Sequence, residues 1–244
     1  MAPMKDTQAI TLWVLFGTGS KYETKRLNGI SHFLEHLFFK GTKSRPEAGQ
    51  VNRELDRLGA ESNAFTSKEY TGYYVKTAAK HFDTALDIVS DILIGPLFKK
   101  EEIEKERGVI LQEISMYEDD PRRQAAEIFE ELLYGDQPAG WDTAGYPDTV
   151  KNITRDDIVR YKQSHYLTSN AVLAVAGNIE SGAAFKKVEK AFAQMARGEK
   201  LSKPQARDVQ KLPAVKFKKK DVDPSKIKKD IMALDREDIQ KNII

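Results

Sequence analysis

The apolar residues of this chain follow two kinds of pattern, short continuous runs and spacings of three to four. Residues 10–16 form a nearly continuous run of strand formers bounded by Gly17, and residues 171–176 form another, so both predict buried strands. Between Gly29 and Phe39 the apolar residues recur at helical spacing, which predicts an amphipathic helix. The same criteria predict helices over 47–58, 82–94, 99–117, 121–134, 154–165 and 179–197, and a hairpin of strands over 61–65 and 70–76.

The order of these elements indicates the fold class. Strands and helices alternate irregularly along the chain, unlike the strict alternation of a parallel βαβ fold. With 244 residues, the chain is long enough to bury a sizeable core. We therefore expect an α+β fold, in which helices cover one face of a mixed, largely antiparallel sheet.

Composition narrows the class of protein. Hydrophobic residues make up 40% and charged residues 31%, which is typical of neither a disordered tail nor a membrane protein. No apolar run approaches the roughly 18 to 20 residues that span a bilayer. The N-terminal residues lack the pattern of a secretory signal or transit peptide, which favours a bacterial-type cytoplasmic location over the mitochondrial matrix.

Charge gives little support to a nucleic-acid or membrane partner. The formal net charge is only +2, although residues 197–229 are rich in Lys and poor in apolar residues. No aromatic ladder accompanies this stretch, so a solvated linker or edge strand explains it better than a nucleic-acid patch.

Two of the four histidines, His32 and His36, lie four residues apart on a predicted helix. Positions i and i+4 share a helix face, so the two imidazoles can converge on one ion. Glu35 projects to the same face and can accept a proton from a water beside that ion. A single histidine bordering a core is usually structural, but His-x-x-Glu-His on one helix is the inverzincin pattern and favours a metal site.

A catalytic zinc site usually takes a third protein ligand. The chain has no cysteine, so this ligand must be a carboxylate or one of the remaining histidines, His81 and His165. Glu106 and Glu113 are two turns apart on the predicted helix 99–117, at the edge of its apolar face, and so point in nearly the same direction. Glutamates in that position are often merely paired with cations, so the spacing leaves the third ligand open.

Two segments of the sequence resemble a known family. Residues 29–42 read Gly-Ile-Ser-His-Phe-Leu-Glu-His-Leu-Phe-Phe-Lys-Gly-Thr, and residues 104–114 read Glu-Lys-Glu-Arg-Gly-Val-Ile-Leu-Gln-Glu-Ile. Both resemble the pitrilysin family of zinc peptidases, which includes insulin-degrading enzyme and mitochondrial processing peptidase. The similarity extends from about residue 3 to residue 217.

The resemblance implies roles for individual residues. It makes His32, His36 and Glu113 the zinc ligands, Glu35 the general base, and Glu106 a second carboxylate that supports the site. It also implies that Asn63, Ala64 and Phe65 bind the substrate backbone as an added β-strand; without it, Asn63 reads as an ordinary hairpin residue. Each of these residue roles is an expectation from the resemblance.

The sequence also departs from the family pattern. The resemblance implies a further strand before the segment that starts at Met1, which we expect to be missing, and we expect no counterpart of the Arg and Tyr that the family supplies from its other half. We therefore expect a metal-binding peptidase domain over 1–200, followed over 201–244 by a basic linker and the start of a truncated second domain. A second homologous domain or subunit is the implied partner.

Two functions remain open. The first is a zinc-dependent metalloendopeptidase that hydrolyses peptides or unfolded segments. The second is a non-catalytic or incomplete subunit that binds peptides and needs a partner chain for activity. The complete set of His32, Glu35, His36 and Glu113 favours the enzyme, because a scaffold does not need a general base aimed at a metal.

Overall fold

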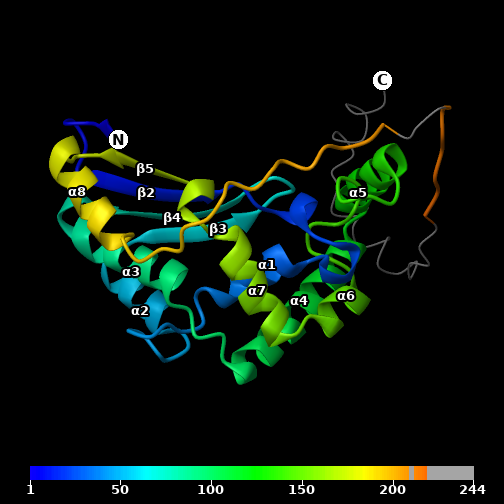
Figure 1. The fold of residues 1–244 in the computed structure, drawn as a ribbon, viewed down its shortest axis with the longest axis horizontal. Helices are drawn as coiled ribbons and strands as arrows, with labels where there is room; N and C mark the ends of the chain where they lie inside the picture. The colour runs from blue at the N-terminus through cyan, green and yellow to red at the C-terminus, as the bar shows by residue number, and fades with distance from the viewer. Residues whose placement is uncertain (209–211, 219–244) are drawn as a thin grey trace, which may run out of the picture. The chain divides into compact units, whose positions relative to one another are not determined.

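The computed structural model describes residues 1–208 and 212–218 (Figure 1). The chain divides into two compact units, 1–211 and 212–244, and every element below belongs to the first. The predicted domain boundary near residue 200 stays a prediction. Residues 209–211 and 219–244, which include much of the predicted second-domain start, lie outside the described residues.

The described residues form five strands and eight α-helices, joined by short 3₁₀ turns. The strands are β1 (Ala2–Pro3), β2 (Ala9–Phe16), β3 (Glu61–Thr66), β4 (Thr71–Ala78) and β5 (Ala171–Gly177). The helices are α1 (Ile30–Leu37), α2 (Gln50–Arg57), α3 (Phe82–Ile94), α4 (Lys100–Asp119), α5 (Pro121–Tyr134), α6 (Pro147–Asn152), α7 (Arg155–His165) and α8 (Ser181–Ala191). None of these helices is both long enough and apolar enough to cross a membrane.

The strands form one sheet in the order β1-β5-β2-β4-β3. β2 pairs antiparallel with both β4 and β5, and β3 pairs antiparallel with β4. Only β1, which is two residues long, pairs in parallel, with β5. The predicted mixed, largely antiparallel sheet is therefore confirmed.

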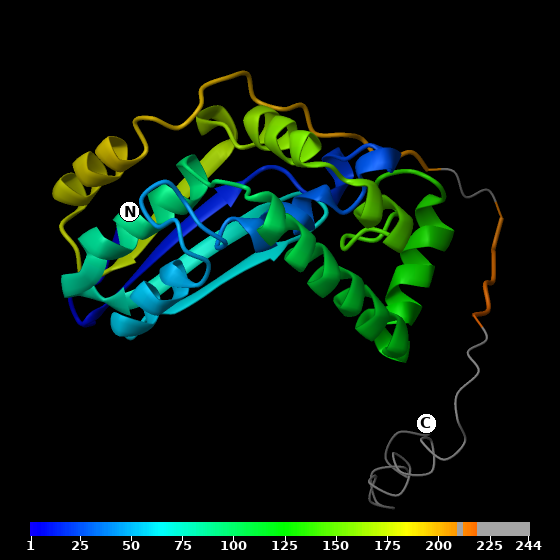
Figure 2. The same cartoon turned by 90° about the horizontal axis from the view of Figure 1, so that it is seen from below.

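The sheet is buried on one face. Along β2 the residues Ile10, Leu12, Val14 and Phe16 are buried and alternate with half-buried ones. The buried side faces the helices, and α2 and α3 lie across it in Figures 1 and 2. On the other face Val172 of β5 is 63% exposed. Residues 10–16 and 171–176 were predicted to be buried strands, but in the described residues helices cover only one face.

Element boundaries differ from the predictions where the backbone changes direction. α2 begins at Gln50 rather than residue 47, because Gly49 adopts a φ of 75°, outside the helical region. The last helix ends at Ala191 rather than residue 197. β1 and α6 were not predicted, since elements this short carry too few apolar residues to show a period. The predicted helix 154–165 is confirmed as α7, which begins with a capping box between Thr154 and Asp157.

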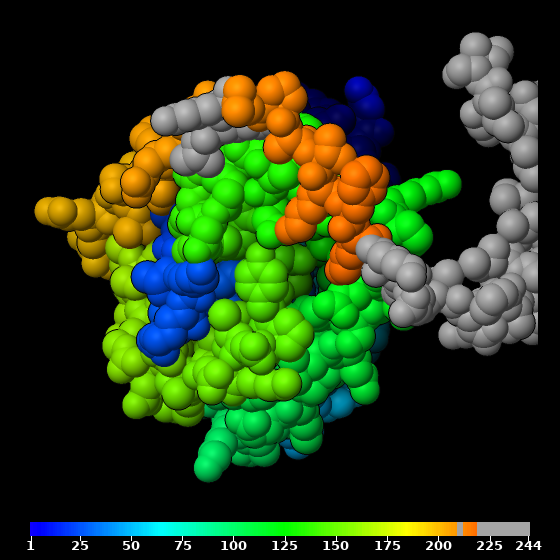
Figure 3. All heavy atoms as spheres, turned by 90° about the vertical axis from the view of Figure 1, so that its right-hand side faces the viewer, coloured from blue at the N-terminus to red at the C-terminus, as the bar shows by residue number. Residues whose placement is uncertain are grey.

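Helix α1 packs between the sheet and α4, against β3 on one side and α4 on the other. It is nearly all buried, and its first residue follows Gly29, whose φ is 95°. In Figure 3 the segment that precedes α1 (blue) is surrounded at the surface by much later parts of the chain (green to yellow-green). The fold thus fixes α1 from its N-terminal end as well as from both sides.

Candidate metal centre

Three side chains from two helices bring their donor atoms together. His32 and His36 are on α1, and their Nε2 atoms lie 3.3 Å apart. Glu113 comes from α4, and its Oε2 lies 3.4 Å from Nε2 of His36 and 3.7 Å from Nε2 of His32. In the described part of the chain, these residues form the one group of three that could hold a metal ion.

The spacing of these atoms can be tested against a zinc ion. Zinc in proteins is usually tetrahedral, with bonds of about 2.0–2.2 Å to nitrogen and oxygen, and such an ion holds its ligand atoms about 3.3 Å apart. The distances of 3.3, 3.4 and 3.7 Å match this value within a few tenths of an ångström. Two imidazoles and one carboxylate are also a donor set found in catalytic zinc sites. The three residues therefore fit zinc.

Glu106 contacts the opposite side of His36. Its Oε2 lies 3.1 Å from Nδ1 of His36, and its Oε1 lies 2.7 Å from the ammonium of Lys40. Glu106 is only 5% exposed, so both of its oxygens need these cationic or donor partners. The two glutamates that share one face of α4 thus have different positions. Glu113 lies among the donor atoms, and Glu106 contacts Nδ1 of His36, on the side of the ring that faces away from those atoms.

Burial and neighbouring charges shift the pKa values of the two histidines in opposite directions when no ion is bound. Burial, together with the charge of His36, lowers the pKa of His32 to about 4. Burial also acts to lower the pKa of His36, but its contacts with Glu106 and Glu113 outweigh burial and raise the pKa to about 9. The contact with His36 in turn lowers the pKa of Glu113 to about 2. An ionised Glu113 is the form that binds a cation.

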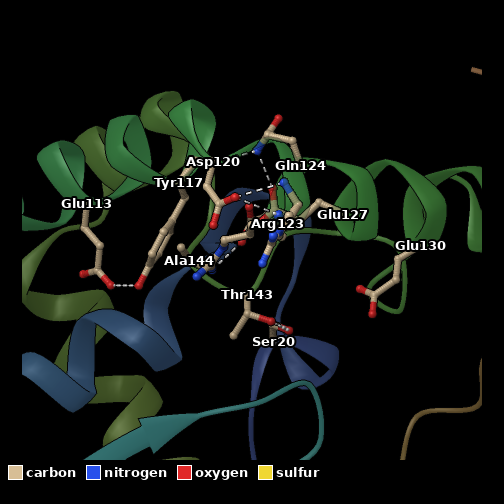
Figure 4. A network of polar contacts seen from close by, with 12 residues as sticks. Ser20, Glu113, Tyr117, Asp120, Arg123, Gln124, Glu127, Glu130, Thr143 and Ala144 are labelled. Atoms are coloured by element: carbon tan, nitrogen blue, oxygen red, sulfur yellow. Dashed lines mark hydrogen bonds and ion pairs between the residues drawn. The ribbon is translucent and has the colours of Figure 1, made fainter. Parts of the chain in front are cut away.

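Tyr117 links Glu113 to a polar network at the start of α5 (Figure 4). The hydroxyl of Tyr117, one turn further along α4, donates a hydrogen bond to Glu113. The guanidinium carbon of Arg123 lies 3.1 Å from the centre of the Tyr117 ring, and its Nε donates to Glu127 at 2.7 Å. We did not predict these residues from the sequence. The i+4 spacing of Tyr117 from Glu113 was the available signal for the first of them.

Glu35 lies beside this centre without joining the three donors. Its Oε2 accepts a 2.6 Å hydrogen bond from the hydroxyl of Thr66 at the end of β3. Burial raises the pKa of Glu35, although the hydrogen bond from Thr66 opposes the rise. A carboxyl group whose pKa is raised towards neutrality can exchange protons more readily at physiological pH.

Glu35 and His36 open into a cavity of about 420 Å³. Asn63 and Ala64 of β3 line it, together with the end of α1 and part of α2. β3 is the last strand in the sheet order, so its outer edge is free of other described strands. The side chain of Asn63 accepts a hydrogen bond from the backbone N–H of Ala64 at 2.9 Å.

Phe65 points away from the cavity. Its ring packs on the opposite face of the sheet, with centres 5.9 Å from Trp13 and 5.8 Å from Tyr70. The ring also lies over Gly72 of β4, where an added Cβ would come within 2.3 Å of it. Only the backbone of Phe65 is therefore placed for contact with a ligand at the strand edge.

Comparison with known families identifies two matches. Residues 2–145 match the family model described as insulinase (peptidase family M16), and residues 152–242 match the model described as peptidase M16 inactive domain. The first match contains His32, His36 and Glu113. The second begins inside the compact unit that ends at residue 211.

Individual relatives agree with these matches. A zinc protease of Bacillus subtilis is 40% identical over 190 residues, which cover 78% of this chain and 46% of the relative. The beta subunit of mitochondrial-processing peptidase from Caenorhabditis elegans is 34% identical over 189 residues, 78% of this chain and 41% of the relative. The chain thus spans less than half the length of these two relatives.

Solved structures show the same similarity. A protease from Helicobacter pylori superimposes with a TM-score of 0.77 at 30% identity, covering 84% of this chain and 50% of that one. Pitrilysin superimposes with a TM-score of 0.75 over 88% of this chain and 23% of its own; at 20% identity, this supports the fold alone. The predicted resemblance is confirmed: the chain belongs to the insulinase family of peptidases, family M16.

Proposed function

We propose that this chain is the metal-binding part of a zinc-dependent metalloendopeptidase. The observation that carries the proposal is the set of His32, His36 and Glu113 donor atoms at the spacing of a tetrahedral zinc ion, beside the buried carboxyl group of Glu35. His32, His36 and Glu113 are the proposed ligands. Glu106 is proposed to orient His36, as carboxylates that contact metal-bound histidines commonly do.

The proposed chemistry is hydrolysis of a peptide bond. Zinc, when bound, polarises the scissile carbonyl group and makes the attacking water more acidic. Glu35 accepts a proton from that water and later delivers it to the departing amide nitrogen. Its position favours both steps, because burial raises its pKa and the hydroxyl of Thr66 holds one oxygen in place.

The proposed substrates are peptides or unfolded segments bound as an added strand. The free edge of β3 beside the 420 Å³ cavity supports this proposal. Asn63, Ala64 and Phe65 would bind the substrate backbone, and the side chain of Asn63 would release the N–H of Ala64 to do so. Contacts of this kind tolerate many substrate sequences.

A second candidate is an incomplete subunit that binds peptides and gains activity only with a partner. The match of residues 152–242 to the model described as peptidase M16 inactive domain favours this candidate. We propose that the partner is a second homologous domain or subunit, and that residues 1–200 form the metal-binding domain with which it acts. A bacterial-type cytoplasmic location stays a prediction.

The decisive experiment measures zinc content and cleavage of an unstructured peptide, with the chain alone and after addition of a companion subunit. We expect one zinc per chain, because the ligand set is complete within it. Cleavage only with the companion would favour the second candidate. Well-folded protein that takes up no zinc from a zinc-containing buffer would contradict both.

The two glutamates of α4 should differ in their effect on zinc binding. We expect Glu113→Gln to weaken zinc affinity more than Glu106→Gln, because Glu113 lies among the donor atoms, whereas Glu106 contacts His36 at Nδ1, the nitrogen that faces away from them. Loss of a group that orients a ligand typically costs about 10–100-fold in affinity, which is the effect expected at Glu106. Competition with a chromogenic chelator measures both; the reverse order would mean that their roles are exchanged.

A further inference from the structure

A buried carboxylate caps the helix that carries both histidines. Glu23, eight residues before Ser31, is only 4% exposed. Its Oε1 accepts the backbone N–H of Ser31 at 2.8 Å, and its Oε2 accepts the backbone N–H of Gly29 at 2.8 Å. The side-chain amide of Asn28 donates to the same Oε2 at 3.0 Å. Glu23 therefore binds N–H groups at the start of α1, which otherwise have no partner within the helix.

No cation pairs with Glu23 among the residues that the structure describes, and its hydrogen-bond donors are neutral. A carboxylate buried in this way loses much of its hydration energy. The positive end of the helix dipole and the converging N–H groups offset that loss. A solvent-exposed cap would satisfy the helix at lower cost, so the buried arrangement indicates a need for a fixed geometry at this helix end.

The residues around Glu23 hold the same helix end on its other sides. The hydroxyl of Tyr161 on α7 lies 2.9 Å from the hydroxyl of Ser31 and 3.1 Å from that of Thr18. Asn28 also donates to the backbone carbonyl of Asp142 at 3.0 Å. At Gly29 an added Cβ would come within 2.7 Å of the backbone oxygen of Ala144, in the loop that contains Asp142. The two segments therefore pass each other without room for a side chain at Gly29.

We propose that Glu23 is a positioning residue for the metal centre. It fixes the backbone of Ser31, and His32 follows directly, so the cap sets the direction in which His32 leaves the helix. His36 lies one turn further on, and its place relative to Glu113 depends on the same helix position. The inference rests on the proposed zinc function, but it concerns how the ligands are held rather than which residues bind.

The test replaces Glu23 by Gln and compares it with a matched control. Gln keeps the size of the side chain, but its NH₂ group cannot accept a hydrogen bond. The backbone N–H of either Gly29 or Ser31 therefore loses its acceptor. Glu180 is the exposed N-cap residue of α8, a helix without metal ligands, and its side chain accepts the N–H groups of Gly182 and Ala183 at 2.7 and 2.6 Å. Glu180→Gln therefore changes a cap without changing α1.

We expect Glu23→Gln to weaken zinc binding by about tenfold or more in chelator competition, and to change the visible absorption spectrum of the cobalt-substituted protein. Glu180→Gln should leave both unchanged, although each variant lowers the unfolding temperature of the metal-free chain. Wild-type zinc affinity and an unchanged cobalt spectrum in folded Glu23→Gln would overturn the proposal.

A second variant covers the case in which Glu23→Gln does not fold. Tyr161→Phe keeps the ring and removes only the hydroxyl that contacts Ser31 and Thr18. We expect a smaller loss of zinc affinity in the same direction, with a shifted cobalt spectrum; no change in either would overturn the inference. If the wild-type chain binds no zinc at all, the proposed function fails. That outcome is distinct from a failure of the inference, in which the wild type binds zinc and the variants bind it equally well.

Discussion

Replacing Glu35 by Gln is expected to reduce peptide cleavage by about 10²- to 10⁴-fold, the usual contribution of a general base, while zinc content stays at one per chain. Gln has nearly the same size and keeps an oxygen that can accept the hydrogen bond of Thr66. It cannot accept a proton from water at neutral pH. The three donor atoms do not include Glu35, so the metal should remain.

This comparison is made in whichever form of the wild type cleaves the peptide, the chain alone or the chain with its companion. Glu47→Gln is a suitable control, since the Glu47 side chain is 76% exposed and pairs only with Arg53 among the described residues. We expect the control to retain wild-type cleavage. Cleavage by Glu35→Gln at the rate of the control would exclude Glu35 as the base.

Replacing His32 by Ala should remove the zinc. The substitution leaves His36 and Glu113 as an incomplete ligand set, and two ligands bind zinc far more weakly than three. We expect a loss of affinity beyond the 10–100-fold typical of residues that only support a ligand, so that the purified variant carries much less than one zinc. Elemental analysis after dialysis against metal-free buffer measures it.

His81→Ala is the matched control for this second experiment. His81 ends a 3₁₀ turn before α3 and belongs to neither the donor group nor its hydrogen bonds in the described residues. It tests whether loss of any histidine lowers zinc content. Retention of one tightly bound zinc by His32→Ala would show that the ion binds elsewhere, and the proposed centre would be abandoned.

The pattern of apolar residues predicted most elements near their observed positions, because each amphipathic helix has one buried face. It predicted burial less well for the strands. Residues 10–16 and 171–176 are apolar almost throughout, but the described helices cover only one side of the sheet. Whether a second layer covers the other side depends on tertiary packing, which a strand's own sequence does not contain.

Spacing within one helix was sufficient to bring His32 and His36 together, since residues four apart share a face. It was not sufficient to choose between Glu106 and Glu113, which point in almost the same direction from α4. The family resemblance favoured Glu113. In the structure, the packing of α1 against α4 places Glu113 beside the Nε2 atoms and Glu106 beside the far nitrogen of His36.

By itself, the sequence determined that this protein has helices and a mixed sheet, that two histidines and a glutamate share a helix face, and that any metal ligands must be histidines and carboxylates. These are properties of short segments and of composition. Only the tertiary structure decided that Phe65 faces away from the cavity and that Glu23 caps the metal-binding helix. Both depend on contacts with distant residues, which no local spacing encodes.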